Sequence, residues 1–329
     1  MDKEQWRFCF NREFEASMRG RSPTVGDNGS SPADRTVMLP ALTASLKTER
    51  VAVTIEQLPL ALHGTTVVQL SDFHFDGYSL SPSLLETAIA QCNRLVPDLV
   101  VLTGDFITRN PSDIEALAVY LQHLRSRLGV YAVLGNHDSP SARVRRHVQQ
   151  TLAAVEVVPL WNDIAYPWGD RLPLVGLADI SSPDCQPELL LAQLPPSTPR
   201  LVLAHNPDTM DKLRSSRADL VLSGHTHGGQ VILPGGIPAP SLLKKLSPWV
   251  PPIVKQQMPF FNQDCERVFR HWEWAAGLHT VGARQLYVNR GLASYWPGRL
   301  FCPPELTVIT LLAAPPLEEK DSAICSGSD

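Results

Sequence analysis

The sequence predicts a single α/β domain, and two observations lead to this fold class. Short apolar runs rich in Val and Leu recur along the chain, and each run is typical of a strand that is buried on both faces. Segments with helical spacing of apolar residues separate several of these runs, as in strand–helix–strand units. The expected strands lie at residues 51–55, 67–70, 99–102, 130–134, 201–204, 220–222 and 306–312.

The expected helices carry either a start signal or an apolar stripe. Ser81 is a suitable N-cap for a helix over residues 83–95, because it is followed by a proline at the first helical position. Residues 111–128 repeat apolar side chains at helical spacing, which predicts a second helix. The remaining expected helices cover residues 141–154 and 208–215.

Composition and charge exclude some classes of protein. Of the 329 residues, 43% are hydrophobic and 19% are charged, so the chain can bury a large core. The formal net charge of −4, and the lack of a basic stripe with interleaved aromatic residues, argue against a nucleic-acid partner. The 6 cysteines are widely spread and form no CxxC pair, which is typical of reduced thiols. We therefore expect a cytoplasmic protein.

The two ends of the chain differ from the domain, which we expect to span residues 36–312. Residues 1–35 are polar and contain no apolar run long enough for a signal peptide or a transmembrane segment. We interpret them as a flexible N-terminal extension, and residues 313–329 as a disordered tail.

Within the domain, residues 235–277 form a proline-rich segment with many apolar and aromatic side chains. Two interpretations of this segment stay open. It is either a cap that packs on the domain, or an apolar and weakly basic surface that receives an acyl chain or contacts a membrane peripherally.

Residues of the types that bind metals follow five of the expected strands. Because open α/β sheets bind ligands at the carboxyl ends of their strands, we expect these side chains to converge. Two pairs have i, i+2 spacing, which in an extended loop places both side chains on one side. A mixture of imidazoles and carboxylates suits two divalent ions of manganese, iron or zinc, of which we favour manganese. The candidate ligands are Asp72, His74, Asp105, Asn136, His205, His225 and His227.

The order of these motifs resembles that of the calcineurin-like metallophosphoesterase superfamily. The matching motifs are Asp72-x-His74, Gly104-Asp105, Gly135-Asn136-His137-Asp138, His205 and Gly224-His225-Thr226-His227. The longer string LSGHTHGGQ is similar to a bacterial branch that includes cell-wall-associated and lipid-A-pathway phosphoesterases. The resemblance covers residues 50–312. It implies a four-layer αββα sandwich, in which two mixed β-sheets are flanked by helices.

The resemblance also implies roles for individual residues. His137 would act as the general acid for the leaving group, and Asp138, which stands where many relatives have Glu, would orient that imidazole. A hydroxide that bridges the metals would attack phosphorus in line. Arg290 would contact a phosphate or form a salt bridge. The implied metal ligands are Asp72, His74 and His227 for the first ion, Asn136, His205 and His225 for the second, and Asp105 as the bridge.

We therefore predict a phosphoesterase that uses two divalent metal ions to hydrolyse a phosphoester or pyrophosphate bond in a small-molecule or lipid-linked substrate. A narrower alternative is a pyrophosphatase of the UDP-2,3-diacylglucosamine type, which the apolar segment at residues 235–277 favours. A scaffold that has lost catalysis would lack ligands, whereas every ligand position and His137 are present here. A nuclease is disfavoured by the acidic charge balance. No motif specifies an oligomeric state.

Overall fold

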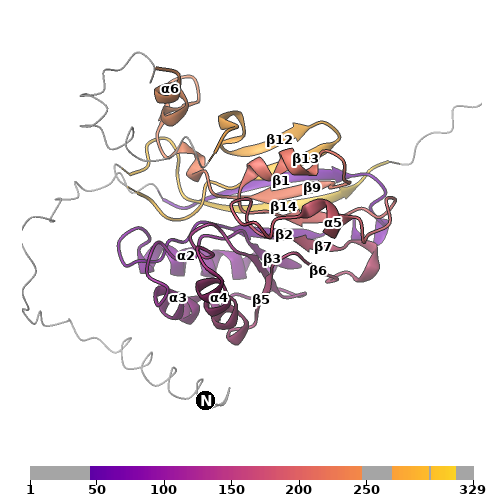
Figure 1. Ribbon diagram of the computed structural model, residues 1–329, viewed down its shortest axis with the longest axis horizontal. Coiled ribbons are helices and arrows are strands. Elements are labelled where there is room, and N and C mark those ends of the chain that lie inside the picture. Colours follow the sequence, from indigo (N-terminus) through magenta and orange to yellow (C-terminus); the bar gives the residue numbers. More distant parts are fainter. Residues whose placement is uncertain (1–44, 247–268, 296–297, 316–329) are drawn as a thin grey trace, which may run out of the picture.

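Two six-stranded β-sheets lie face to face in this protein (Figure 1). The structure is a computed structural model that describes residues 45–246, 269–295 and 298–315. The predicted extension at residues 1–35, most of the predicted tail and the middle of the predicted proline-rich cap lie outside the described residues.

The first sheet is mixed, because its second strand in spatial order runs antiparallel to the third while the other neighbours are parallel. This second strand is the last strand along the described part of the chain, and Ile309 pairs there with Val67. In spatial order the strands are β1 (Lys47–Ile55), β14 (Glu305–Ala313), β2 (Thr66–Leu70), β3 (Leu99–Leu102), β4 (Val130–Val133) and β5 (Val157–Leu160).

The second sheet is also mixed. Its three central pairs are parallel and its two edge strands are antiparallel to their neighbours. In spatial order the strands are β12 (Gly277–Val281), β13 (Arg284–Val288), β9 (Leu220–Ser223), β8 (Leu201–Leu203), β7 (Leu174–Gly176) and β6 (Asp163–Ala165).

Helices cover the outer faces of both sheets. The first sheet is covered by α2 (Pro82–Arg94), α3 (Asp113–Leu121) and α4 (Ala142–Ala154), which lie together in Figure 1. The second sheet is covered by α5 (Pro187–Leu191) and the 3₁₀ helix η4 (Pro207–Leu213). This arrangement confirms the predicted four-layer αββα architecture.

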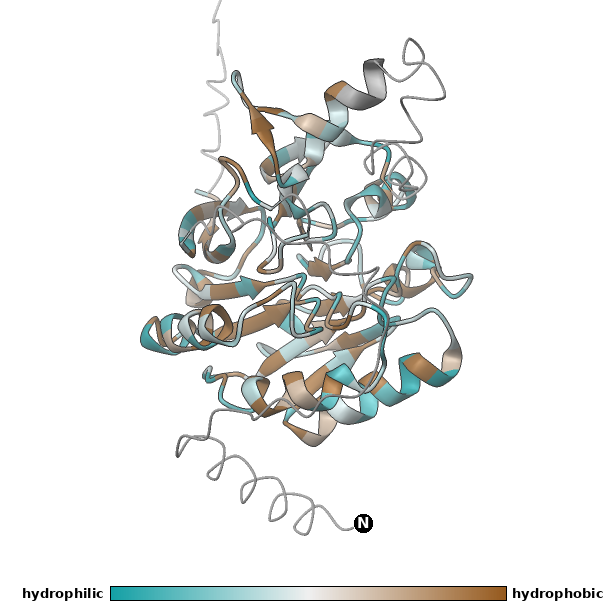
Figure 2. Cartoon of the chain, turned by 90° about the vertical axis from the view of Figure 1, so that its left-hand side faces the viewer, coloured by the Kyte–Doolittle hydropathy of each residue, from teal (hydrophilic) through white to brown (hydrophobic). Residues whose placement is uncertain are grey.

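Alternation along the strands explains why the layers stack in this way. In β3, Leu99 and Val101 face the core between the sheets, whereas Val100 and Leu102 face the helices. Neighbouring side chains of a strand point to opposite faces, so a strand that is apolar throughout is buried on both. Figure 2 shows the result: hydrophobic strands fill the interior, and the helices turn their hydrophilic sides outward.

The predicted helices are present, with some changes of extent. Ser81 accepts a hydrogen bond from the backbone N–H of Leu84, which confirms the N-cap predicted for α2. Helix α3 is shorter than predicted, because the residues after Leu121 form turns with i→i−3 hydrogen bonds. The helix expected over residues 208–215 is the 3₁₀ helix η4.

Several short elements complete the fold. A hairpin of β10 (Ile232–Leu233) and β11 (Ile237–Pro238) leads into α6 (Ala239–Leu246) at the start of the predicted cap. Within the described part of the chain, no helix combines the length and the apolar character needed to cross a membrane. Among the described residues, the remaining 3₁₀ helices are η2 (Leu60–Leu62), η3 (Gly169–Arg171), η5 (His227–Gly229) and η7 (Trp272–Trp274).

Candidate metal centre

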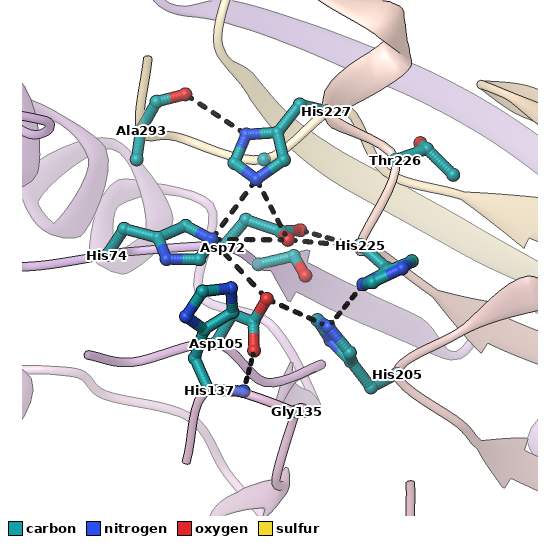
Figure 3. A network of polar contacts seen from close by, with 12 residues as sticks. Asp72, His74, Asp105, Gly135, His137, His205, His225, Thr226, His227 and Ala293 are labelled. Carbon is teal, nitrogen blue, oxygen red and sulfur yellow. Dashed lines mark hydrogen bonds and ion pairs between the residues drawn. The ribbon is translucent and has the colours of Figure 1, made fainter. Parts of the chain in front are cut away.

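Polar side chains from five turns meet where β2, β3, β4, β8 and β9 end (Figure 3). In three groups, the potential ligand atoms lie within 4.8 Å of one another. The groups therefore contain every predicted His and Asp ligand, together with His137. They are Asp72 with His74 and His227 (the first group), Asp105 with His205 and His225 (the second group), and His74 with Asp105 and His137, which combines residues of both groups with His137.

The first group joins the turn after β2 to the turn after β9. The Nε2 atoms of His74 and His227 are 3.1 Å apart, and His227 Nε2 is 3.4 Å from Asp72 Oδ1. The backbone N–H of His225 donates to both carboxylate oxygens of Asp72, at 3.0 Å each. All three side chains of the group are buried, with Asp72 completely inaccessible to solvent.

The second group joins the turns after β3, β8 and β9. His205 Nε2 lies 3.0 Å from Asp105 Oδ2 and 3.1 Å from His225 Nδ1. Asp105 Oδ2 is also 3.4 Å from His74 Nε2, which belongs to the first group. Asp105 therefore contacts one imidazole of each group through the same oxygen.

The chemistry of this donor set fits metal ions. Twice, two imidazole nitrogens face each other at 3.1 Å, an arrangement in which at most one of the two can donate a proton. The Oδ1 atom of Asn136 is buried and has no hydrogen-bond partner among the described residues, as expected of an oxygen that awaits a ligand. Cations held between the carboxylates and imidazoles would satisfy these atoms.

Contacts between backbone carbonyls and the Nδ1 atoms fix the orientation of two imidazoles. The carbonyl of Thr103 lies 2.6 Å from Nδ1 of His205, and the carbonyl of Ala293 lies 3.4 Å from Nδ1 of His227. A carbonyl at Nδ1 accepts a hydrogen bond from the N–H of that nitrogen, so the proton stays on Nδ1 and Nε2 is the electron-pair donor in the tautomer that binds a metal.

The backbone at the ligands is left-handed. Five residues have positive φ values: Asp72 (52°), His74 (37°), Asp105 (54°), His225 (71°) and His227 (50°). Such values are uncommon in residues other than glycine and gather at functional sites. The expectation of extended loops at the ligands was therefore wrong. As a consequence, the two side chains of the pair His225 and His227 do not contact the same partner. His225 contacts His205, whereas His227 contacts His74, so an i, i+2 spacing serves both groups.

Burial and neighbouring charges shift the pKa values of the histidine ligands in two directions. Burial lowers the pKa of His74 to about 3 and that of His227 well below its usual range, so both imidazoles are neutral. Burial alone would also lower the pKa of His205, but the carboxylates of Asp105 and Asp72 raise it to about 10.

The pKa values of the Asp72 and Asp105 carboxyl groups shift in opposite directions. Burial raises the pKa of Asp72 to about 6. Burial would do the same to Asp105, but its contact with His205 holds the pKa of this carboxyl well below the ordinary value. In the protein without metal, Asp105 and His205 therefore form an ion pair, and a cation has to displace the proton of His205.

His137 lies beside the first group. Its ring packs edge-on against the ring of His74, with the centroids 4.9 Å apart. Its Nδ1 atom lies 2.7 Å from the carbonyl of Thr108, and its backbone N–H donates to Asp105 Oδ1 at 3.1 Å. The carbonyl of Thr108 therefore orients the imidazole and leaves Nε2 for other partners.

The predicted orientation of His137 by Asp138 is wrong. The Asp138 side chain is fully buried and accepts three backbone N–H groups, from Phe106 (2.8 Å), Ile107 (3.2 Å) and Gly135 (2.9 Å). These bonds hold the turn after β3 against the turn after β4. The carboxylate points into the backbone of these turns, because their unpaired N–H groups need an acceptor in a buried position.

The phosphate contact considered for Arg290 is not what the structure shows. The guanidinium is 2.8 Å from Glu49 Oε1 and 2.8 Å from Glu305 Oε2, so the salt bridge is the interaction that forms. Both partners come from strands of the first sheet. Arg290 therefore links the turn after β13 to that sheet.

Two further residues near the site were not identified in the sequence. The Arg299 guanidinium is buried and donates to the carbonyls of Arg290, Gly291, Ala293 and Cys302, which holds the turn after β13 in place. The ring of Tyr295 packs against His74 and His227. Neither residue belongs to a recognisable motif, and both reach the site through long-range packing.

Comparison with known proteins identifies the family. A family model described as calcineurin-like phosphoesterase matches residues 65–229. The phosphodiesterase YaeI of Escherichia coli (strain K12) is 32% identical over 255 residues, which cover 75% of this chain and 82% of the relative. The UDP-2,3-diacylglucosamine pyrophosphatase LpxG of Chlamydia muridarum is 29% identical over 300 residues, covering 77% and 85%. The chain therefore belongs to the calcineurin-like phosphoesterase family.

Proposed function

We propose that this chain hydrolyses a phosphoester or pyrophosphate bond at a centre that holds two divalent metal ions. Its relatives are named phosphodiesterase, pyrophosphatase and metallophosphoesterase, which supports the class of hydrolase. The observation that carries the proposal is the position of Asp105, whose Oδ2 lies 3.4 Å from His74 Nε2 and 3.0 Å from His205 Nε2. A carboxylate oxygen that contacts both ligand groups is placed to bridge two cations.

The residues divide between the two ions as the ligand groups do. When bound, two such ions supply Lewis acidity to the phosphoryl group and a nucleophile that is deprotonated near neutral pH. Manganese is the proposed metal, because it accepts both imidazole and carboxylate ligands. The proposed ligands are Asp72, His74 and His227 for one ion, Asn136, His205 and His225 for the other, and Asp105 for both.

His137 is the proposed proton donor to the leaving-group oxygen. Its Nδ1 atom is held by the Thr108 carbonyl, so Nε2 is the atom that exchanges a proton with the substrate. A ring nitrogen of His137 also lies within 4.8 Å of potential ligand atoms of His74 and Asp105. An alternative role of His137 as a metal ligand therefore needs its own test.

The variant His137→Ala separates these two roles. As a proton donor, His137 contributes to turnover only, so the variant should keep its metal while turnover falls by roughly 10²–10⁴-fold. Metal content is measured on the purified protein, and turnover with an aryl phosphodiester. An inactive variant that has also lost a metal ion would show that His137 is a ligand.

The function itself is tested by metal analysis together with a panel of three substrates in added manganese: an aryl phosphate monoester, an aryl phosphodiester and a UDP-linked acylated sugar. About two metal ions per chain and turnover of at least one substrate are expected. A protein that binds no metal and turns over none of the three would refute the proposal.

A narrower candidate is a pyrophosphatase for a nucleotide-linked lipid precursor, and one observation favours it. A cavity of about 630 Å³ begins at Gly228, directly after the ligand His227, and its wall includes Ile232, Ile237, Pro238 and Trp272. Thr226 Oγ1 donates to the Ala275 carbonyl at 2.5 Å, which fixes the far wall of the cavity to the ligand turn. Arg270 and Glu273 also line this cavity, and its apolar part suits an acyl chain beside a phosphoryl site.

The variant Ile237→Ser tests this candidate, because Ile237 lines the cavity and is not one of the proposed metal ligands. An acyl-binding cavity predicts lower kcat/KM for the acylated sugar nucleotide and unchanged kcat/KM for the aryl diester. An equal loss on both substrates would leave the cavity without a role in substrate choice.

We further propose that the enzyme works in the cytoplasm and contacts membranes peripherally. Cys92, Cys185 and Cys302 are free buried thiols, as is usual in a reducing compartment. Phe301 is 79% exposed, and its neighbour Leu300 pairs with the chain next to the β10–β11 hairpin, close to the cavity. Sedimentation with anionic liposomes tests the contact: binding that Phe301→Ser does not weaken would contradict it.

A further inference from the structure

The hydroxyl of Tyr295 is buried and lacks a hydrogen-bond partner among the described residues. Buried tyrosine hydroxyls ordinarily have one. Tyr287 of the same chain follows this rule, because its hydroxyl donates to Glu305 Oε1 at 2.6 Å. The hydroxyl of Tyr295 therefore needs an explanation that the fold alone does not supply.

Tyr295 belongs to the wall of the metal centre. Its ring lies 4.9 Å from the ring of His74 and 5.1 Å from the ring of His227, measured between centroids. Its backbone N–H donates to Gln230 Oε1 at 2.6 Å, which ties it to the turn that carries His227. His137, the proposed proton donor, packs against the same His74 ring.

The polar side chain near the phenol is that of Thr108. The Thr108 hydroxyl donates to Asp76 Oδ2 at 2.9 Å and keeps its lone pairs free to accept, which makes Thr108 the alternative partner of the phenol, but the geometry in the structure closes no hydrogen bond between the two hydroxyls. The carboxylates of Asp72 and Asp105 also act on the phenol, and both are proposed to bind metal. The phenol therefore lies beside two proposed metal ligands, where a bound phosphoryl group would offer its hydroxyl an acceptor.

We propose that the Tyr295 hydroxyl donates a hydrogen bond to a non-bridging oxygen of the substrate's phosphoryl group, a role that rests on the proposed function. A neutral donor that is already in place stabilises negative charge as it develops on these oxygens. The ordinary pKa of a phenol, about 10, keeps the proton on such a donor at neutral pH. His137 would then serve the leaving group, and Tyr295 the phosphoryl oxygens.

The test compares Tyr295→Phe with Tyr131→Phe in the manganese-loaded protein. Tyr131 is a half-buried tyrosine of β4 whose ring packs against the core between the sheets, so its variant controls for the loss of a hydroxyl. Three quantities are measured: manganese per chain, the Kd of inorganic phosphate by calorimetry, and kcat/KM for the best substrate of the panel.

A hydrogen bond to a charged phosphoryl oxygen predicts that kcat/KM falls about 10- to 100-fold in Tyr295→Phe, that phosphate binds more weakly, and that manganese content is unchanged. Unchanged kcat/KM and phosphate affinity would overturn the proposal and assign the hydroxyl to Thr108. Loss of manganese would overturn it too, by giving Tyr295 a role in supporting His74. A wild-type protein without manganese or turnover would instead refute the proposed function.

Discussion

Replacing Asp138 with Asn distinguishes a carboxylate that holds two turns together from one that orients a catalytic histidine. The change keeps the size of a side chain that is fully buried. In the structure, Oδ1 accepts the N–H groups of Phe106 and Ile107, and Oδ2 accepts that of Gly135. An amide offers one acceptor oxygen and one NH₂ group, so at least one of these N–H groups must face another donor.

The expected loss of stability follows from this count. In the better orientation of the amide, the N–H of Gly135 alone loses its acceptor, and a buried unsatisfied donor costs about 1–3 kcal/mol. The other two bonds change from charge-assisted to neutral, which adds about 1 kcal/mol. A total of about 2–4 kcal/mol corresponds to a Tm lower by about 5–10 °C in a protein of this size.

The assay follows thermal unfolding with and without manganese, and manganese affinity by calorimetry. Burial and the nearby Asp105 raise the pKa of Asp138 to about 7, so measurement at about pH 8 keeps the wild-type carboxylate ionised. Because Gly135 and Asp105 belong to the turns that Asp138 connects, manganese affinity should fall about 10- to 100-fold.

The matched control is Asp208→Asn, since Asp208 is also buried and accepts two backbone N–H groups, from Arg270 (2.7 Å) and His271 (3.2 Å). It should lose stability without the loss of manganese affinity. If Asp138→Asn instead kept the wild-type Tm and manganese affinity while turnover fell, the carboxylate would act on His137 and the reasoning from its three contacts would fail.

Three further predictions concern the ligands themselves. Asp105→Asn should lower manganese from about two ions per chain to at most one, measured by elemental analysis, and reduce turnover about 10³-fold; two retained ions would exclude the bridging role. Gly291→Ala should destabilise the protein more than Gly282→Ala and should also weaken manganese binding. Both glycines have positive φ, but only at Gly291 would a Cβ meet Asp72, at 2.6 Å. Equal effects of the two variants on Tm would refute this prediction. Because the pKa of His205 is raised to about 10 without metal, manganese binding should release about one proton near neutral pH and weaken about tenfold for each unit of lower pH; calorimetry in buffers of different ionisation enthalpy would contradict this by showing no proton release.

The parts of this protein that sequence reasoning predicted are those that local rules determine. An apolar run such as Leu99–Leu102 predicts a doubly buried strand, and a polar residue after its end lies at the edge of the sheet. The N-cap at Ser81 is equally local. Repeated along the chain, these two rules bring the candidate ligands to one edge, whereas the order of the strands in each sheet depends on tertiary structure.

The errors arose where a side chain takes its partner from a distant part of the chain. The family resemblance implied that Asp138 orients His137, yet two of the three N–H groups that its oxygens accept belong to Phe106 and Ile107, 32 and 31 residues earlier. The partner of Arg290 at Glu49 lies 241 residues away. Spacing along the sequence contains no information about such pairs, because the turn after β13 meets β1 only once both sheets have formed.

The glycines that precede the ligands show how packing determines the motifs. Gly135 and Gly224 lie outside the positive-φ region, so their turns do not require glycine for conformational reasons. A Cβ at Gly135 would come within 2.0 Å of Asp105 Oδ1, and one at Gly224 within 2.4 Å of Asp72 Oδ2. Each glycine therefore makes room for a carboxylate that belongs to a different turn. Glycine before Asn136 and before His225 is therefore a requirement of the assembled centre, and for this reason the motifs are informative together and weak alone.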